Sequence, residues 1–385
     1  MLGLLLVLLA ILWWAFAPGL LVKIPKGVNT TIYNEGKYTW YVNPLTYELL
    51  PEGQALVLPA KIKVNLHSED EEYDADTAVI SGSVESSIGD IALPEITFTI
   101  VLDRSTAVNQ SDSRAYIIRE GFLVDRSGYL SYVFPFGTKK TSYDVWKEEI
   151  GAPMSMNFVG EDKRDGLTVF NFAGGFEERE VLKEYIEFLG LPASISGQQL
   201  EGILTAMGID ARELLALAQQ RMSPEDKQAL DQALAKGVPI KYYWSCDVSY
   251  SVEPTTGLIV DCDRDWESTT VKVDQDALTG IFAIFAKYLQ DPVLGPVLQR
   301  LASAGLSPEK MSGVRVMEYE FSQTEESVKS SVADAIKGKK AITFVKLWIP
   351  LIILIVGLIV MLVGLFVARR KGKSETKASS SGSKL

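Results

Sequence analysis

The chain has 385 residues, of which 47% are hydrophobic and 23% charged, and this ordinary composition excludes a disordered or fibrous protein. Its formal net charge is −11, although the segment after Val367 is basic, so the rest of the chain is more acidic than the total suggests. Because an acidic surface repels nucleic acid and anionic headgroups, neither is an expected partner of the main body.

The first predicted element is a transmembrane helix at residues 1–23. Residues 2–22 carry no charged side chain and would form a helix of about 31 Å, which matches a hydrocarbon core of about 30 Å. A cleaved signal peptide is the alternative, because Ala15, Phe16 and Ala17 have the small-x-small pattern of a cleavage site. No basic residue precedes the apolar run and Pro18 follows the site directly, so a retained helix is favoured.

The next region, residues 24–176, is predicted to be the first part of a β-rich extracytoplasmic domain. Its clearest strand is 96–102, which is rich in β-branched residues, and similar runs occur at 78–84, 115–118, 129–134 and 167–172. The period then changes, and residues 177–237 are predicted to be a helical insertion. Within it, Ser223 is a candidate N-cap for a helix that begins at Pro224.

A predicted hairpin at 244–266 carries both cysteines of the chain. Its strands, 244–252 and 258–266, flank a turn with Pro254 early and Gly257 late. Alternation places the mostly apolar even-numbered residues, including Cys246 and Cys262, toward the core. The odd-numbered residues then form a solvent-facing polar side: Asp247, Ser249, Ser251, Glu253, Asp261, Asp263, Asp265 and Glu267.

The two cysteines are a candidate disulfide, because an oxidising compartment favours pairing. A register that pairs Glu253 with Gly257 would leave Cys246 and Cys262 diagonal, about 7 to 8 Å apart at Cα. A disulfide would therefore need a β-bulge that shifts one strand. Two buried free thiols are the alternative.

The second part of the domain, residues 238–340, also contains a helical stretch at 274–304. Residues 278–289 are apolar on nearly every face, so this helix must be buried, line an apolar cavity or touch a bilayer. The candidate contacts with an apolar ligand or with the membrane are therefore Leu278, Ile281, Phe282, Phe285 and Leu289.

A second transmembrane helix is predicted at residues 341–368, followed by a basic cytoplasmic tail at 369–385. Gly357 and Gly364 share a helix face, which would allow close packing of the two membrane helices or self-association. The flanks predict a cytoplasmic C-terminus and an extracytoplasmic middle section, because positive charges mark the cytoplasmic side. The interface anchors are Lys346, Trp348, Arg369, Arg370 and Lys371.

The residues that carry most catalytic chemistry are scarce. His67 is the one histidine, beside an acidic run at 68–72, and no nucleophile or nucleotide-binding motif occurs. Asp261, Asp263 and Asp265 resemble the start of a calcium loop, but Trp266 replaces its required Gly. We therefore expect neither an enzyme nor a cofactor, while calcium binding to the acidic loops stays an open alternative.

Several short stretches resemble the porin PorA-like family, long labelled a domain of unknown function. They include Asp-Arg-Ser-Gly at 125–128, Phe-Pro-Phe-Gly-Thr at 134–138 and Val-Glu-Pro-Thr-Thr-Gly at 252–257, with further matches at 322–326 and 347–350. The resemblance implies an envelope protein of actinobacteria or some related bacteria, with two end anchors around a β-rich domain, and it supplies no catalytic residues.

The predicted fold class is therefore α+β, with a β-rich extracytoplasmic domain, helical insertions and one transmembrane helix at each end. The favoured function is binding or passing a lipid or other apolar ligand at the outer face of the membrane, and its plan is analogous to that of two-anchor scavenger-receptor lipid receptors. A scaffold that binds partner envelope proteins is the alternative. A hydrolase is less favoured because the chain has one histidine and no nucleophile motif. A porin is less favoured because the acidic, helix-interrupted middle section does not show the strands of about 9 to 11 residues that a membrane barrel needs.

Overall fold

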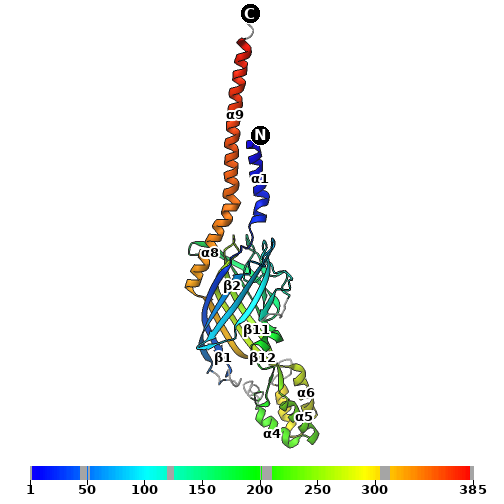
Figure 1. The fold of residues 1–385 in the computed structure, drawn as a ribbon. Helices are drawn as coiled ribbons and strands as arrows, with labels where there is room; N and C mark the ends of the chain where they lie inside the picture. Colours follow the sequence, from blue (N-terminus) through cyan, green and yellow to red (C-terminus); the bar gives the residue numbers. More distant parts are fainter. Residues whose placement is uncertain are drawn as a thin grey trace.

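The computed structural model describes residues 2–43, 50, 53–118, 125–199, 201, 210–303 and 313–381. Figure 1 shows three parts along one long axis: two apolar helices at one end, a strongly curled β-sheet in the middle, and a group of short helices at the other end. This arrangement confirms the predicted α+β class with two flanking helices.

The described residues form one antiparallel sheet of thirteen strands with the order β6-β5-β3-β2-β1-β13-β12-β11-β9-β8-β7, in which β4 also pairs with β3 and β10 with β11. The two halves of the chain meet where β1 pairs with β13, with Asn34 opposite Gln323. The strands are β1 (Asn29–Trp40), β2 (Leu56–Ser68), β3 (Thr77–Ile88), β4 (Ile91–Ala92), β5 (Ile96–Asp103), β6 (Tyr116–Ile118), β7 (Tyr143–Lys147), β8 (Ala152–Arg164), β9 (Leu167–Glu180), β10 (Ser194–Ile195), β11 (Val238–Val252), β12 (Ile259–Val273) and β13 (Val314–Gln323).

The chain between β5 and β7 links the two ends of this sheet. Leu102 of β5 pairs with Asn109, Val108 pairs with Leu130, and Leu130 pairs with Val145 of β7. The sheet therefore curls around an interior instead of ending in two open edges. The predicted strand at 129–134 contributes only such isolated bridges.

The inside of the sheet is apolar and its outside is charged. In β1, Tyr38 lies inside while Glu35 and Lys37 are exposed, and in β2, Ile62 lies inside while Lys61 is exposed. A water-filled transmembrane barrel has the opposite distribution, with an apolar outer band and a polar lumen. Several strands have 12 to 15 residues, so the prediction that the middle section lacks strands long enough for a barrel was wrong, while the polarity of those strands differs from that of a membrane barrel.

The two apolar helices at one end belong to α1 (Leu2–Leu21) and to a long helical segment made of α8 (Glu325–Thr343), the π-helical turn η1 (Phe344–Trp348) and α9 (Ile349–Ser381). Both α1 and this segment have the length and composition to cross a membrane. They lie side by side (Figure 1), and Trp13 Nε1 donates to the carbonyl oxygen of Val345 at 3.1 Å.

Close packing of α1 on α9 depends on small residues. A Cβ on Gly3 would lie 2.6 Å from the backbone nitrogen of Met361, and one on Gly357 would lie 3.0 Å from the Cβ of Leu6. A Cβ on Gly364 would meet nothing within 4 Å. Gly357 therefore packs against α1 of the same chain, while Gly364 faces open space.

The helices at the far end form a separate small core. They are α4 (Ala211–Arg221), α5 (Pro224–Ala235), α6 (Gln275–Ala286) and α7 (Leu294–Ser303), while the short α2 (Lys183–Phe188) packs on the sheet. The Ser223 side chain accepts a hydrogen bond from the Asp226 N–H, as expected for the N-cap of α5. The two predicted helical regions pack together because β11 and β12 are antiparallel. Ile240 lies opposite Val273, so the end of α5, before β11, lies near the beginning of α6, after β12. The shared core consists of Ala218, Met222, Leu230, Phe285, Leu294 and Leu298.

Candidate functional site

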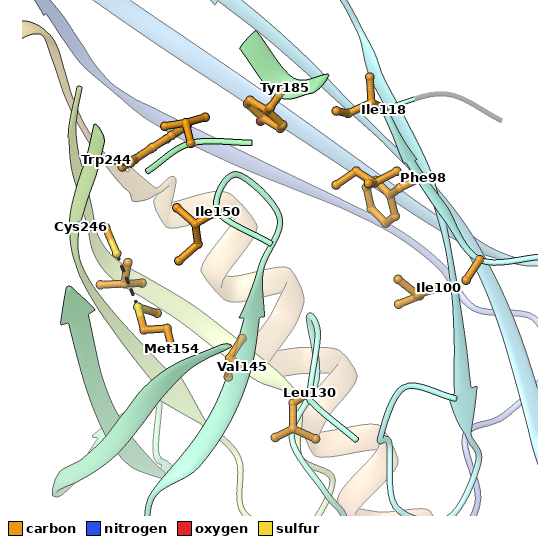
Figure 2. Packing of buried hydrophobic residues seen from close by; sticks show 14 of the residues in the cluster. Phe98, Ile100, Ile118, Leu130, Val145, Ile150, Met154, Tyr185, Trp244 and Cys246 are labelled. Atoms are coloured by element: carbon orange, nitrogen blue, oxygen red, sulfur yellow. Dashed lines mark hydrogen bonds between the residues drawn. The ribbon is translucent and has the colours of Figure 1, made fainter. Parts of the chain in front are cut away.

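The curled sheet encloses a cavity of about 430 Å³. This volume falls within the range of about 300 to 1,000 Å³ that is typical of small-molecule sites. It extends along the strands from Ile32 on β1 and Leu66 on β2 to Trp40 and to Leu191, near the helices of the far end. Figure 2 shows how residues from separate elements surround this interior, with Phe98 on β5, Tyr185 on α2 and Trp244 on β11.

Most of the cavity wall is aliphatic or aromatic, because strand alternation directs these side chains inward. Tyr132 is an instructive case: it lines the cavity and stacks on Phe98 with ring centroids 4.9 Å apart, yet 37% of its surface is accessible. That accessible surface faces an internal space. Its φ of 59° lies in the left-handed region, a strained conformation for a bulky residue that is often found at functional sites.

One part of the wall is polar. Lys147, at the end of β7, forms an ion pair with Glu267 of β12, with Nζ 3.0 Å from Oε1 and both side chains largely buried. Burial lowers the pKa of Lys147, but the carboxylates of Glu267, Asp265 and Glu149 outweigh this effect and raise it overall. Burial also raises the pKa of Glu267, against the effect of Lys147. The lining residues Lys147, Glu148, Glu149, Asp265 and Glu267 are called the polar wall below.

A second buried ion pair supports the polar wall from behind. Arg126 Nη1 lies 2.5 Å from Glu148 Oε1, and Arg126 Nη2 donates to the carbonyl oxygens of Thr99 at 2.7 Å and Tyr116 at 3.2 Å. Arg126 itself does not line the cavity. It therefore holds the segment that carries Glu148 against β5 and β6. Burial raises the pKa of Glu148, although Arg126 opposes the shift.

Three acceptor atoms of the polar wall have no hydrogen-bond partner among the residues that the structure describes. These are Glu148 Oε2, Asp265 Oδ1 and Glu267 Oε2, all buried. Buried polar atoms are satisfied in the great majority of cases, so each exception calls for an explanation. An apolar cavity with unsatisfied acceptors in one part of its wall is suited to an amphiphile with a polar end.

The positions of Asp265 and Glu267 correct the prediction that these acids face solvent. Ser249 pairs with Arg264 while Tyr250 pairs with Cys262, so Asp263 is an extra residue in β12. Such a bulge reverses which side chains point inward from that point on. Strict alternation assigned the two acids to the outer face because it does not include the bulge.

The predicted disulfide was also wrong. Cys246 lies opposite Glu267 and Cys262 lies opposite Tyr250, which places their pairing positions four residues apart along β11, about 13 Å. Both thiols are free. The bulges shift the strands away from a disulfide register. Cys246 Sγ instead contacts Met154 Sδ at 3.5 Å (Figure 2), and burial raises the pKa of this thiol to about 12.

The predicted apolar contact residues whose side chains the structure describes do not lie in the cavity wall. Phe285 is buried in the core of α4–α7, Ile281 packs against it, and Phe282 is half-buried on the same helix. Leu289 is 38% exposed beyond the end of α6. These residues belong to the end of the molecule opposite α1 and α9 (Figure 1). The side chain of Leu278 lies outside the described part of the structure.

The predicted interface anchors lie at the ends of the apolar part of α9. Lys346 and Trp348 belong to η1, where Trp348 is 51% exposed, and Arg369 is exposed at the other end. The side chains of Arg370 and Lys371 lie outside the described residues.

The exposed His67 ring lies 2.9 Å from Glu69 Oε1 on the outside of β2. Within the described ranges, no group of three or more His, Cys, Asp or Glu side chains is placed to hold a metal ion.

Comparison with known proteins gives one consistent result. The sequence model of the family described as Porin PorA matches residues 1–366. Two curated relatives carry the name "Porin PorA": one from Corynebacterium resistens is 24% identical over 147 residues, and one from Corynebacterium amycolatum is 25% identical over 149 residues. The alignments cover 36% and 38% of this chain and 36% and 35% of the relatives, so the chain spans about a third of the length of these relatives.

Proposed function

The chain belongs to the PorA family of porins, and from that premise we propose that it is a membrane-anchored envelope protein that binds or passes a lipid or other apolar ligand. The cavity carries this proposal. It is lined mainly by aliphatic and aromatic side chains, and the sheet that encloses it is held next to two apolar helices. An apolar cavity of this size favours an acyl chain over a polar solute.

The proposed topology has two membrane passes, an extracytoplasmic sheet and a cytoplasmic C-terminus. Lys346 and Trp348, next to α8, are suited to a membrane interface, and the basic residues that begin at Arg369 follow the positive-inside rule. Because α1 and α9 both lie at the same end of the curled sheet, one opening of the sheet would face the bilayer (Figure 1). Membrane lipid is therefore the proposed partner, and nucleic acid is not.

The names of the relatives favour a pore as the second candidate. The charged outer face and apolar interior of the sheet argue against inserting the sheet itself in a bilayer. A pore made from assembled apolar helices would lack a polar stripe to line it. An enzymatic role is not proposed, because the one histidine is exposed on the outer face and forms no triad among the described residues.

A cavity-filling variant tests the proposal. Val64→Trp places an indole in the cavity from the inner face of β2, whereas Lys61→Trp adds the same group on the exposed outer face of that strand. We expect the purified wild-type protein and Lys61→Trp to retain lipid that organic extraction and mass spectrometry detect. Val64→Trp should lose most of it. Lipid-free wild-type protein would contradict the proposal and favour the scaffold alternative.

Conductance in planar bilayers separates lipid binding from pore formation. The proposal predicts no channel activity from the purified protein. Ion conductance that Val64→Trp abolishes and Lys61→Trp preserves would assign the cavity to a pore and overturn the lipid hypothesis.

A further inference from the structure

We propose that the polar wall selects an acyl amphiphile whose polar end is uncharged and bears hydroxyl groups, in preference to anionic or cationic amphiphiles of the same chain length. This inference rests on the proposed function, since it concerns the ligand of the same cavity. Three features of the wall carry it: unsatisfied acceptors, opposed charges of both signs, and adjacent tyrosines.

The unsatisfied acceptors call for a ligand that donates hydrogen bonds. Asp265 Oδ1 and Glu267 Oε2 are buried without a partner among the described residues, and Glu267 is only 2% exposed. Both side chains line the cavity from β12 and are two residues apart on one face, roughly 7 Å. A polar end with two or more hydroxyl groups has the span and the donors to reach both oxygens.

The charges of the wall disfavour an ionised ligand of either sign. An anionic headgroup would lie beside the carboxyl groups of Glu148, Glu149, Asp265 and Glu267, where repulsion acts with little solvent screening. A cationic headgroup would lie beside Lys147, which already forms the ion pair with Glu267. An uncharged donor avoids both penalties.

Tyrosine side chains complete the polar surroundings. Tyr38, Tyr132, Tyr185 and Tyr250 all line the cavity. Burial raises the pKa of each phenol and nearby carboxylates such as Glu267 and Glu149 add to the shift, so the hydroxyls stay protonated. Protonated phenols both donate and accept hydrogen bonds, which suits a ligand rich in hydroxyl groups.

Three probes with the same sixteen-carbon chain test this preference on the full chain in detergent: 1-monopalmitoyl glycerol, palmitate and hexadecyltrimethylammonium. Native mass spectrometry titrations at neutral pH give the fraction bound for each. We expect the monoglyceride to bind at least about tenfold more tightly than either ion. This is the affinity ratio that corresponds to the loss of one charge-assisted hydrogen bond. Equal or tighter binding of palmitate or of the ammonium probe would overturn the inference.

Variants of Asp265 add a second readout. Asp265→Leu should weaken monoglyceride binding by about tenfold and reduce the discrimination against palmitate, and Asp265→Asn, which keeps one acceptor, should lose less. Asp247→Asn, an exposed acid on the outside of β11 paired with Arg264, is the matched control and should change neither value. If Asp265→Leu left the ratio of monoglyceride to palmitate affinity unchanged, the inference would also be overturned. If all three probes bound equally and Val64→Trp abolished their binding, the proposed function would stand without the inference. Failure of every probe to bind wild-type protein would contradict both.

Discussion

At the residue scale, the cavity is unusual because buried charges lie next to apolar side chains. The Lys147–Glu267 pair has side chains that are 12% and 3% exposed. Removing water from such a pair costs several kcal/mol for each ion, and only good geometry and further hydrogen bonds offset it. Glu267 lacks one of those hydrogen bonds. The pair therefore contributes little net stability.

The first prediction concerns this pair. Lys147→Met should destabilise the protein by about 3 to 5 kcal/mol, because it leaves the Glu267 carboxyl buried without a cation. The double variant Lys147→Met/Glu267→Leu should restore wild-type stability or exceed it, since no buried charge of the pair is left. A double-mutant cycle from chemical unfolding of the purified protein measures both effects. A double variant less stable than Lys147→Met would contradict the argument.

At the element scale, the turn between β11 and β12 anchors the helix that leads to the membrane. Glu253 is fully buried, accepts hydrogen bonds from Thr256 N at 2.8 Å and Thr256 Oγ1 at 2.9 Å, and pairs with Lys339 of α8 at 3.0 Å. Val332 and Ala335 of α8 pack on Val260 beside this turn. This turn is therefore one of the sites that fix α8 on the sheet; another is β1, where the Tyr33 N–H donates to Ser327 Oγ of α8 at 3.1 Å.

The second prediction follows from the pKa of Glu253. Burial raises this pKa, but the hydrogen bonds from Lys339 and Thr256 outweigh burial and lower it overall. A lowered pKa in the folded state gives stability that is present above the unfolded pKa of about 4.3 and is lost as pH falls through the folded value. Lys339→Met should thus lower the melting temperature at pH 7 and make much less difference below pH 4. An equal effect at both pH values would contradict it.

The third prediction concerns the packing of α1 on α9. Gly357→Ile places a branched side chain where a Cβ would already lie 3.0 Å from Leu6, so the two helices must separate. Gly364→Ile is the matched control, because a Cβ there meets nothing within 4 Å. Crosslinking by a short bis-maleimide between cysteines introduced at Trp13 and Val345, which contact each other across the two helices, should fall strongly in Gly357→Ile and stay unchanged in Gly364→Ile. Undiminished crosslinking in Gly357→Ile would show that this contact does not hold the helices together.

At the scale of the whole molecule, the apolar segments and the cavity lie along one axis. Both apolar helices meet the same end of the sheet, and the core of α4–α7 lies at the opposite end (Figure 1). On the far helices, Leu289 and Val293 are exposed.

The fourth prediction tests the proposed topology. In intact cells, a membrane-impermeant maleimide should label Glu35→Cys, on the exposed outer face of β1, and should leave Arg369→Cys unlabelled until the membrane is permeabilised. The native thiols are poor targets because burial raises the pKa of both. If only Arg369→Cys were labelled in intact cells, the topology would be the opposite of the one proposed.

The sequence by itself determined the features that depend on local composition and period. The two apolar helices follow from uncharged runs at residues 2–22 and 347–367, and the cap of α5 follows from Ser223 and Pro224. Strands such as 96–102 follow from β-branched residues. The coarse α+β class is therefore readable from the sequence, because each of these signals involves residues close together in the chain.

Only the tertiary structure decided where the cavity lies and which residues line it. The pairing of β1 with β13 joins segments almost 300 positions apart, and the bulge at Asp263 turns Asp265 and Glu267 inward. The same bulges separate Cys246 from Cys262, and the antiparallel hairpin brings α6 onto α4 and α5. Register and long-range pairing are set by the packing of the whole sheet, so alternation along one strand does not reveal them.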